Sequence, residues 1–145
     1  MQNTFIMCIG NRYGGDDGVG AYIADKMKKT SQNILDCDTT PENYTAVVKQ
    51  KKPKTLIIID AAEMNLTAGE IRIIPKEKIG IMHISTHGIP LSLLITYIEK
   101  EIKKIILIGI QPKRMSGSIS SMVKKSADHL IKILHEQRYE EIQIL

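Results

Sequence analysis

The chain has 145 residues, of which 43% are hydrophobic, and this is ordinary for one globular domain with its own core. Its formal net charge of +4 comes mainly from lysine clusters, but no aromatic residues alternate with these lysines, which argues against a nucleic-acid surface. No apolar run approaches the roughly 18 to 20 residues that cross a bilayer, and the first residues lack a cleavable signal pattern, so we expect a cytoplasmic protein without membrane insertion.

Short apolar runs alternate with helical patterns along the chain, which is typical of βαβ units and a parallel sheet. In chain order the pattern predicts a strand over 4–9, a helix over 19–29, a strand over 33–37, a helix over 42–50, a strand over 55–60, a loop over 61–69, an edge or antiparallel strand over 69–74, an irregular segment over 75–86, a helix over 90–100, a strand over 104–110, a loop over 111–117, a helix over 118–136 and a short final strand over 141–145. The expected fold is a single α/β domain over residues 1–145. It is a three-layer sandwich, with helices on both faces of a mostly parallel, twisted sheet of about five strands.

Polar side chains follow apolar strands at several points. Asp16 and Asp17 lie between the first strand and a helix, Asp60 closes another apolar run, and His87 follows a third apolar segment. Each has an ordinary explanation, because one Asp can cap a helix, Asp60 can lie in a turn and His87 in a tight connection. Ligands of parallel α/β sheets collect where strands end, however, so we expect Asp17, Asp60 and His87 to meet. Two carboxylates and one imidazole favour a divalent metal with open coordination positions.

Other kinds of site have less support. The glycines after the first strand do not form G-x-G-x-x-G, and two carboxylates occupy the helix start that would attract phosphate, so we expect neither a nucleotide nor another organic cofactor. Cys8 and Cys37 lack metal-site spacing and are predicted to be buried free thiols. His129 and His135 are predicted to be exposed or close to a helix end.

Several short motifs follow one another in a fixed order along the chain. They are Gly10-Asn11 with Asp16-Asp17-Gly18-Val19-Gly20, Pro41-Glu42-Asn43, Ile59-Asp60-Ala61 followed by Gly69-Glu70-Ile71-Arg72, Ser85-Thr86-His87-Gly88-Ile89-Pro90-Leu91-Ser92 and Gly109-Ile110-Gln111-Pro112. In this order and spacing the chain resembles the NiFe-hydrogenase maturation endopeptidases, especially the branch that acts on energy-converting hydrogenases. The resemblance covers nearly the whole chain.

The resemblance implies an aspartyl-type endopeptidase. Members of this family remove a short C-terminal extension from the hydrogenase large-subunit precursor after nickel has been inserted, just after the last cysteine motif that holds the metal. The resemblance implies that Asp17, Asp60 and His87 contact the nickel that the precursor carries. Some relatives have Glu where this chain has Asp17, which shortens the reach of the carboxylate and keeps its charge.

Further roles are expectations around this core. Asp16 is expected to accept a proton or to support His87. Asn43 and Gln111 are expected to flank the crevice and bind the substrate chain, with turn formation as the alternative for both regions. Two other functions stay open, namely a nickel-binding or chaperone module without proteolysis and a general metallopeptidase of small peptides.

Overall fold

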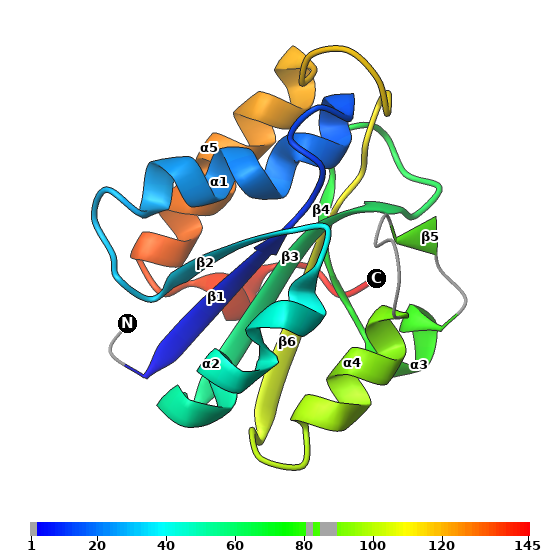
Figure 1. The fold of residues 1–145 in the computed structure, drawn as a ribbon. Helices are drawn as coiled ribbons and strands as arrows, with labels where there is room; N and C mark the ends of the chain where they lie inside the picture. The colour runs from blue at the N-terminus through cyan, green and yellow to red at the C-terminus, as the bar shows by residue number, and fades with distance from the viewer. Residues whose placement is uncertain (1–2, 81–82, 85–89) are drawn as a thin grey trace.

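A twisted sheet with helices on both faces forms the frame of the protein (Figure 1). The computed structural model describes residues 3–80, 83–84 and 90–145. The strands are β1 (Thr4–Ile9), β2 (Ile34–Asp38), β3 (Thr55–Glu63), β4 (Ile71–Ile74), β5 (His83–Ile84) and β6 (Lys104–Ile110). The α-helices are α1 (Val19–Met27), α2 (Thr45–Lys51), α3 (Lys76–Ile79), α4 (Leu91–Ile98) and α5 (Ser121–His135), and the 3-10 helices are η1 (Gly15–Gly18), η2 (Pro41–Tyr44) and η3 (Tyr139–Glu141).

The sheet is mostly parallel, as the sequence predicts. Its strand order is β2-β1-β3-β6-β4, and β5 pairs with the end of β3 outside this path. The pairs β1–β2, β1–β3 and β3–β6 are parallel, whereas β4 runs antiparallel to β6 at the edge. The prediction of an edge or antiparallel strand over 69–74 is therefore confirmed in type. Among the described residues, no helix combines the length and the apolar character that a bilayer crossing requires.

Two apolar layers share β3 at the centre of the sheet. Ile57 and Ile59 face the layer formed with α1 and α5, while Leu56 and Ile58 face the layer formed with α2, α3 and α4. All four side chains are almost fully buried. A strand that is covered on both faces needs apolar residues at every position, and this explains the continuous hydrophobic run before Asp60.

The structure corrects several predicted boundaries. The segment expected as a loop after residue 60 begins as strand, because Ala61 pairs with β6 and the next two residues pair with β5. The irregular segment contains the short α3 and β5, and the helix predicted over 42–50 divides into η2 and α2. The final strand predicted over 141–145 is not formed: η3 ends at Glu141, and the segment after it makes only an isolated parallel bridge between Ile144 and Ile73.

Candidate active site

The carboxyl edge of the parallel strands holds two buried carboxylates. Asp17 lies in η1, which follows β1 after the loop 10–14, and is 4% exposed, and Asp60 lies in β3 and is fully buried. The pairing of β1 with β3 ends at Cys8 and Ile59, so Asp60 comes just beyond it, and η1 contacts β3 in this region. The segments that carry Asp17 and Asp60 are thus brought together, as expected. His87, the third predicted ligand, lies outside the described residues.

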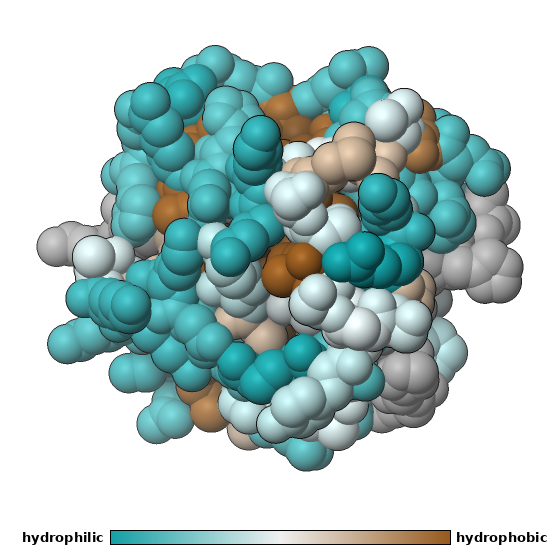
Figure 2. Space-filling model, turned by 90° about the horizontal axis from the view of Figure 1, so that it is seen from above, coloured by the Kyte–Doolittle hydropathy of each residue, from teal (hydrophilic) through white to brown (hydrophobic). Residues whose placement is uncertain are grey.

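Figure 2 views the molecule from above, toward the end where the β1–α1 and β6–α5 loops lie. Patches of hydrophobic residues interrupt a mostly hydrophilic surface in this view.

Among the residues that the structure describes, which do not include His87, no three histidine, cysteine or acidic side chains form a group that could hold a metal. Metal binding by Asp17, Asp60 and His87 therefore remains a prediction.

Two glycines allow η1 and α1 to lie directly against the end of β1. A Cβ atom at Gly10 would come within 2.1 Å of the Asp17 carbonyl oxygen, and one at Gly20 within 2.2 Å of the Ile9 carbonyl oxygen. Such contacts are far shorter than van der Waals separation, so only glycine fits at these close approaches. The glycine-rich character of this loop serves to place Asp17 against the sheet.

Asp16 contacts the loop between β6 and α5. Its Oδ2 accepts hydrogen bonds from the Lys113 amide (2.7 Å), the Arg114 amide (3.1 Å) and the Ser120 hydroxyl (2.9 Å), and its Oδ1 accepts one from the Ser120 amide (2.6 Å). Burial acts to raise the pKa of Asp16, but these hydrogen bonds outweigh it and hold the pKa below its ordinary value. Capping does not account for this residue, because the N-cap position of α1 is Gly18.

The side chain of Gln111 is used inside the protein. It is 3% exposed, and its Oε1 accepts hydrogen bonds from the amides of Met64 (2.7 Å) and Leu66 (3.3 Å). Its Nε2 donates to Glu63 Oε2 (2.7 Å) and to the Pro112 carbonyl (3.3 Å). This network fixes the chain after β3. These bonds occupy the Gln111 side chain inside the protein, and a contact between Gln111 and substrate stays a prediction.

Asn43 differs from Gln111 in its surroundings. It lies in η2, which follows β2, and its side chain is exposed. A substrate contact by Asn43 stays a prediction. His129 and His135 are exposed on α5, as predicted.

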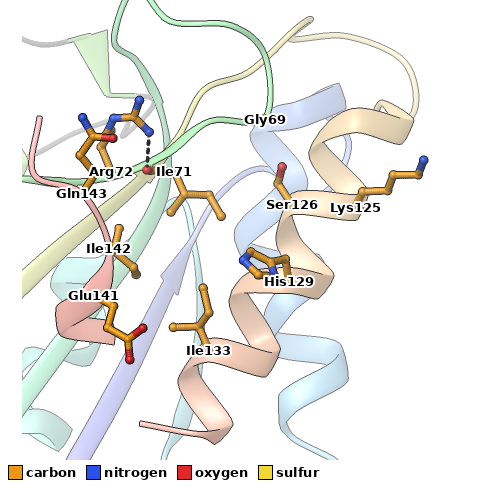
Figure 3. Close-up of a pocket in the computed structure, with 10 residues that line it drawn as sticks. All are labelled: Gly69, Ile71, Arg72, Lys125, Ser126, His129, Ile133, Glu141, Ile142 and Gln143. Atoms are coloured by element: carbon orange, nitrogen blue, oxygen red, sulfur yellow. Dashed lines mark hydrogen bonds between the residues drawn. The ribbon is translucent and has the colours of Figure 1, made fainter. Parts of the chain in front are cut away.

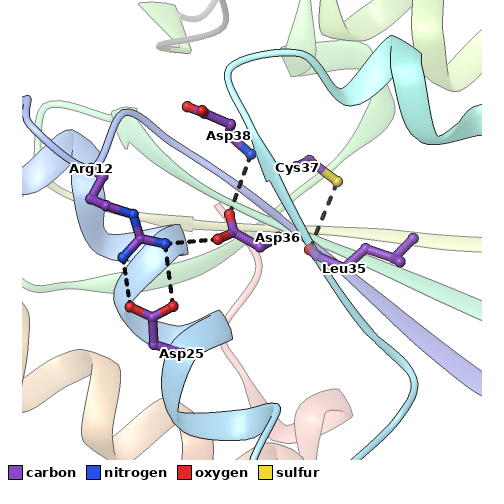
Figure 4. Close-up of polar contacts among 6 residues, drawn as sticks. All are labelled: Arg12, Asp25, Leu35, Asp36, Cys37 and Asp38. Carbon is purple, nitrogen blue, oxygen red and sulfur yellow. Dashed lines mark hydrogen bonds and ion pairs between the residues drawn. The ribbon is translucent and has the colours of Figure 1, made fainter.

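Arg12 anchors the other side of the β1–α1 loop, a role that has no signal in the local sequence (Figure 4). Its guanidinium donates to both oxygens of Asp25 on α1 (2.6 and 3.2 Å) and to Asp36 on β2 (2.8 Å). The hydrogen bond from Arg12 holds the pKa of Asp25 below its ordinary value. Arg12 therefore ties the loop that precedes Asp17 to one helix and one strand.

The cavity in Figure 3 is lined by other residues than Asp16, Asp17 and Asp60. It has a volume of about 510 Å³ and lies between β4, α5 and the C-terminal segment, with Ile71, His129 and Glu141 among its lining residues. None of the predicted site residues lines it. The volume of this cavity therefore does not identify the candidate active site. We place that site at the carboxyl edge of the sheet, where the buried acids lie.

This arrangement defines an α/β protein with acidic groups buried at the carboxyl edge of a mostly parallel sheet, and two solved peptidase structures share its architecture. The solution structure of the endopeptidase HycI from Escherichia coli superposes with a TM-score of 0.84 and 31% identity, covering 94% of this chain and 91% of that one. The crystal structure of the NiFe hydrogenase maturation protease HycI from Thermococcus kodakarensis gives 0.81 and 30%, covering 93% and 91%.

Sequence comparison agrees. The hydrogenase 3 maturation protease of Escherichia coli K12 is 37% identical over 111 residues, which cover 74% of this chain and 71% of that protein. The hydrogenase maturation protease family model matches residues 19–137. This chain belongs to the hydrogenase maturation protease family and is a hydrolase. The matched region contains positions 43, 60, 87 and 111 and begins two residues after Asp17.

Proposed function

We propose that this protein is the endopeptidase that removes the C-terminal extension from a nickel-loaded NiFe-hydrogenase large-subunit precursor. The observation that carries the proposal is the burial of Asp17 and Asp60 on neighbouring segments at the carboxyl edge of the sheet. Family membership supplies the reaction class, and the buried acids supply a reason for nickel to be recognised. The precursor is the partner, and its nickel belongs to the substrate.

The donor set suits this role. Carboxylate oxygens of Asp17 and Asp60 and the imidazole of His87 are ligands that a borderline divalent ion such as nickel accepts. Asp17 lies in η1, which contacts β3, and Asp60 lies within β3, so both acids are held by regular structure. Ligands fixed in this way favour a metal that arrives with the substrate, since little reorganisation is needed on binding. The bound metal would bring the scissile peptide beside these acids and could polarise its carbonyl group.

Removal of each proposed ligand is expected to stop processing. The variants Asp17→Ala, Asp60→Ala and His87→Ala should each lower the cleavage rate by at least about 100-fold, because each removes a group that holds the reacting centre. The measurement is mass spectrometry of a nickel-loaded precursor, with the fold of each variant checked by circular dichroism. His129→Ala is the matched control, since His129 is exposed on α5 and should keep wild-type activity.

The same assay separates the alternatives. A protein that binds nickel-loaded precursor firmly without trimming it would be a nickel-binding module. Cleavage of unrelated peptides by metal-loaded enzyme would indicate a general metallopeptidase. Precursor from which nickel has been withheld should remain uncut, and a His87→Ala protein that trims at the normal rate would refute the role of His87.

A further inference from the structure

The loop between β6 and α5, which includes the 113–120 segment, is hydrogen-bonded to the loop that carries Asp17. Asp16 makes these bonds: its carboxylate accepts four hydrogen bonds from residues of the 113–120 segment, and its amide donates to the Arg114 carbonyl at 2.9 Å. Both loops lie at the same end of the molecule in Figure 1. Residues 104 positions apart in the sequence, Asp16 and Ser120, thus form a clasp over the carboxyl edge of the sheet.

Backbone packing supports the clasp beside these hydrogen bonds. Gly15 has a φ of +63°, and a Cβ atom there would come within 2.6 Å of both the amide nitrogen and the carbonyl oxygen of Ser116. The second loop therefore lies directly on the backbone of η1. A side chain at position 15 would separate the two loops, and a left-handed φ also favours glycine.

We propose that Asp16 is a positioning residue, which holds Asp17 in place by clasping η1 to the 113–120 segment. This inference rests on the proposed function of Asp17. The two residues are adjacent, so their Cα atoms are only about 3.8 Å apart and a shift of one moves the other. Misplacement of a reacting group by about 1 Å can lower a rate by about 100-fold.

A direct role in proton transfer fits the same contacts less well. Asp16 is fully buried, and each of its two oxygens already accepts at least one hydrogen bond from the protein. Because Asp16 is 0% exposed, a substrate could reach this carboxylate only after η1 and the 113–120 segment had separated. The expectation that Asp16 accepts a proton is therefore replaced by a role in which the carboxylate stays bound to the second loop.

Ser120 offers a test that leaves the Asp16 carboxylate intact. Ser120→Ala removes one bond of the clasp, the 2.9 Å contact from the hydroxyl to Oδ2, and Ser120→Thr retains a hydroxyl. Ser118→Ala is the matched control, because Ser118 lies exposed in the same segment and no hydrogen bond to Asp16 involves it. Asp16→Asn replaces one acceptor oxygen by an NH₂ donor, so at least one of the donors that surround this side chain loses its acceptor.

The first readout is cleavage of the nickel-loaded precursor at a temperature where every variant is folded. We expect kcat to fall about 3- to 10-fold in Ser120→Ala and about 10- to 100-fold in Asp16→Asn, with the wild-type pH profile retained and with recovery in Ser120→Thr. Ser118→Ala should match the wild type. The second readout is the NMR position of the Asp17 and Gly18 amide signals, which should move in Ser120→Ala and return in Ser120→Thr.

The outcomes are distinct. Lower melting temperatures with unchanged kcat and unmoved Asp17 signals would reduce the clasp to a purely structural contact and overturn the proposal. Full activity in Ser120→Ala together with a changed pH profile in Asp16→Asn would restore the proton-acceptor role and also overturn it. If the wild type does not cut the precursor, the proposed function fails, whereas the NMR readout still decides whether the clasp positions Asp17.

Discussion

Arg12 is the residue on which the first loop depends for its ion pairs. Its guanidinium bridges Asp25 and Asp36, and the Arg12 and Asp25 side chains are 43% and 53% exposed. Water and salt screen such a pair, so its contribution to stability is small although its geometry is bidentate. The main effect of Arg12 is therefore to hold the β1–α1 loop against α1 and β2, and its effect on the stability of the whole fold is small.

The pair with Asp25 gives a pH dependence of known sign. The pKa of Asp25 is lowered from 3.8, mainly by the hydrogen bond from Arg12. A lowered folded-state pKa means that the stabilisation is present above the ordinary pKa and is lost as the pH falls through the folded value. We expect Arg12→Met to lower the free energy of unfolding by about 1 kcal/mol or less at pH 7, and by less below about pH 4.

Urea unfolding of wild type, Arg12→Met, Asp25→Asn and the double variant at several pH values measures this difference. High salt should reduce the difference in the free energy of unfolding between wild type and Arg12→Met, as low pH does. A difference that stays constant from pH 7 to pH 3 would show that Arg12 stabilises the protein by packing and not through its charge.

Prediction from sequence succeeds best for residues whose environment is set by neighbours that are close in the sequence. Cys8 and Cys37 are buried free thiols, and burial raises the pKa of Cys37 to about 12. The hydrogen-bond partners of Asp16 and Gln111 could not be predicted in this way, because they lie 104 and 47 positions away in the chain. A polar residue after a strand looks the same in sequence whether it meets a ligand or another loop.

At the scale of elements, the junction of β1, η1 and α1 determines where Asp17 lies. Gly10 and Gly20 remove the side chains that would otherwise separate the helix from the strand. The sequence predicts the strand, the helix and the site between them, since periodicity and turn residues are local signals. It does not predict that β3 continues past Asp60, because that continuation depends on pairing with β5 and β6.

Substitution of Gly10 tests this junction. Gly10→Ala should lower the free energy of unfolding by about 1 to 3 kcal/mol, because its Cβ would overlap the Asp17 carbonyl and force the backbone apart. Cleavage should fall as well, since Asp17 moves with that carbonyl group. Denaturant unfolding and the precursor assay measure the two effects.

Gly80→Ala is the matched control. Among the described residues no atom lies within 4 Å of a Cβ at Gly80, and its φ of −69° is open to any residue, so stability should stay within about 0.5 kcal/mol of wild type. Equal stability of Gly10→Ala and wild type would contradict the close approach of η1 to β1.

At the scale of the whole molecule, β3 joins the two apolar layers. Ile57 contributes to the layer with α1 and α5, and Ile58 to the layer with α2 to α4, although they are neighbours in one strand. Loss of either layer exposes one face of the same central strand. The two layers should therefore fold and unfold together.

Ile57→Ala and Ile58→Ala test this coupling. Each should lower the free energy of unfolding by about 2 to 5 kcal/mol, the usual loss for removal of a large buried side chain. Amide hydrogen exchange should show α4 and α5 losing protection to the same extent in both variants. Loss of protection confined to the helix beside the altered residue would contradict a single cooperative unit.

The position of Asp60 inside a strand has a consequence for quality control. A carboxylate on a flexible loop could follow a metal centre through several positions, whereas one in a strand that is paired with β6 has a fixed position. In the proposed reaction, the nickel of an incompletely assembled precursor would not reach the Asp60 carboxylate, and this precursor would dissociate without being cleaved. The rigid sheet would thereby distinguish assembled from incompletely assembled precursor. The position of the β3 backbone would set how far the nickel could deviate before cleavage stops.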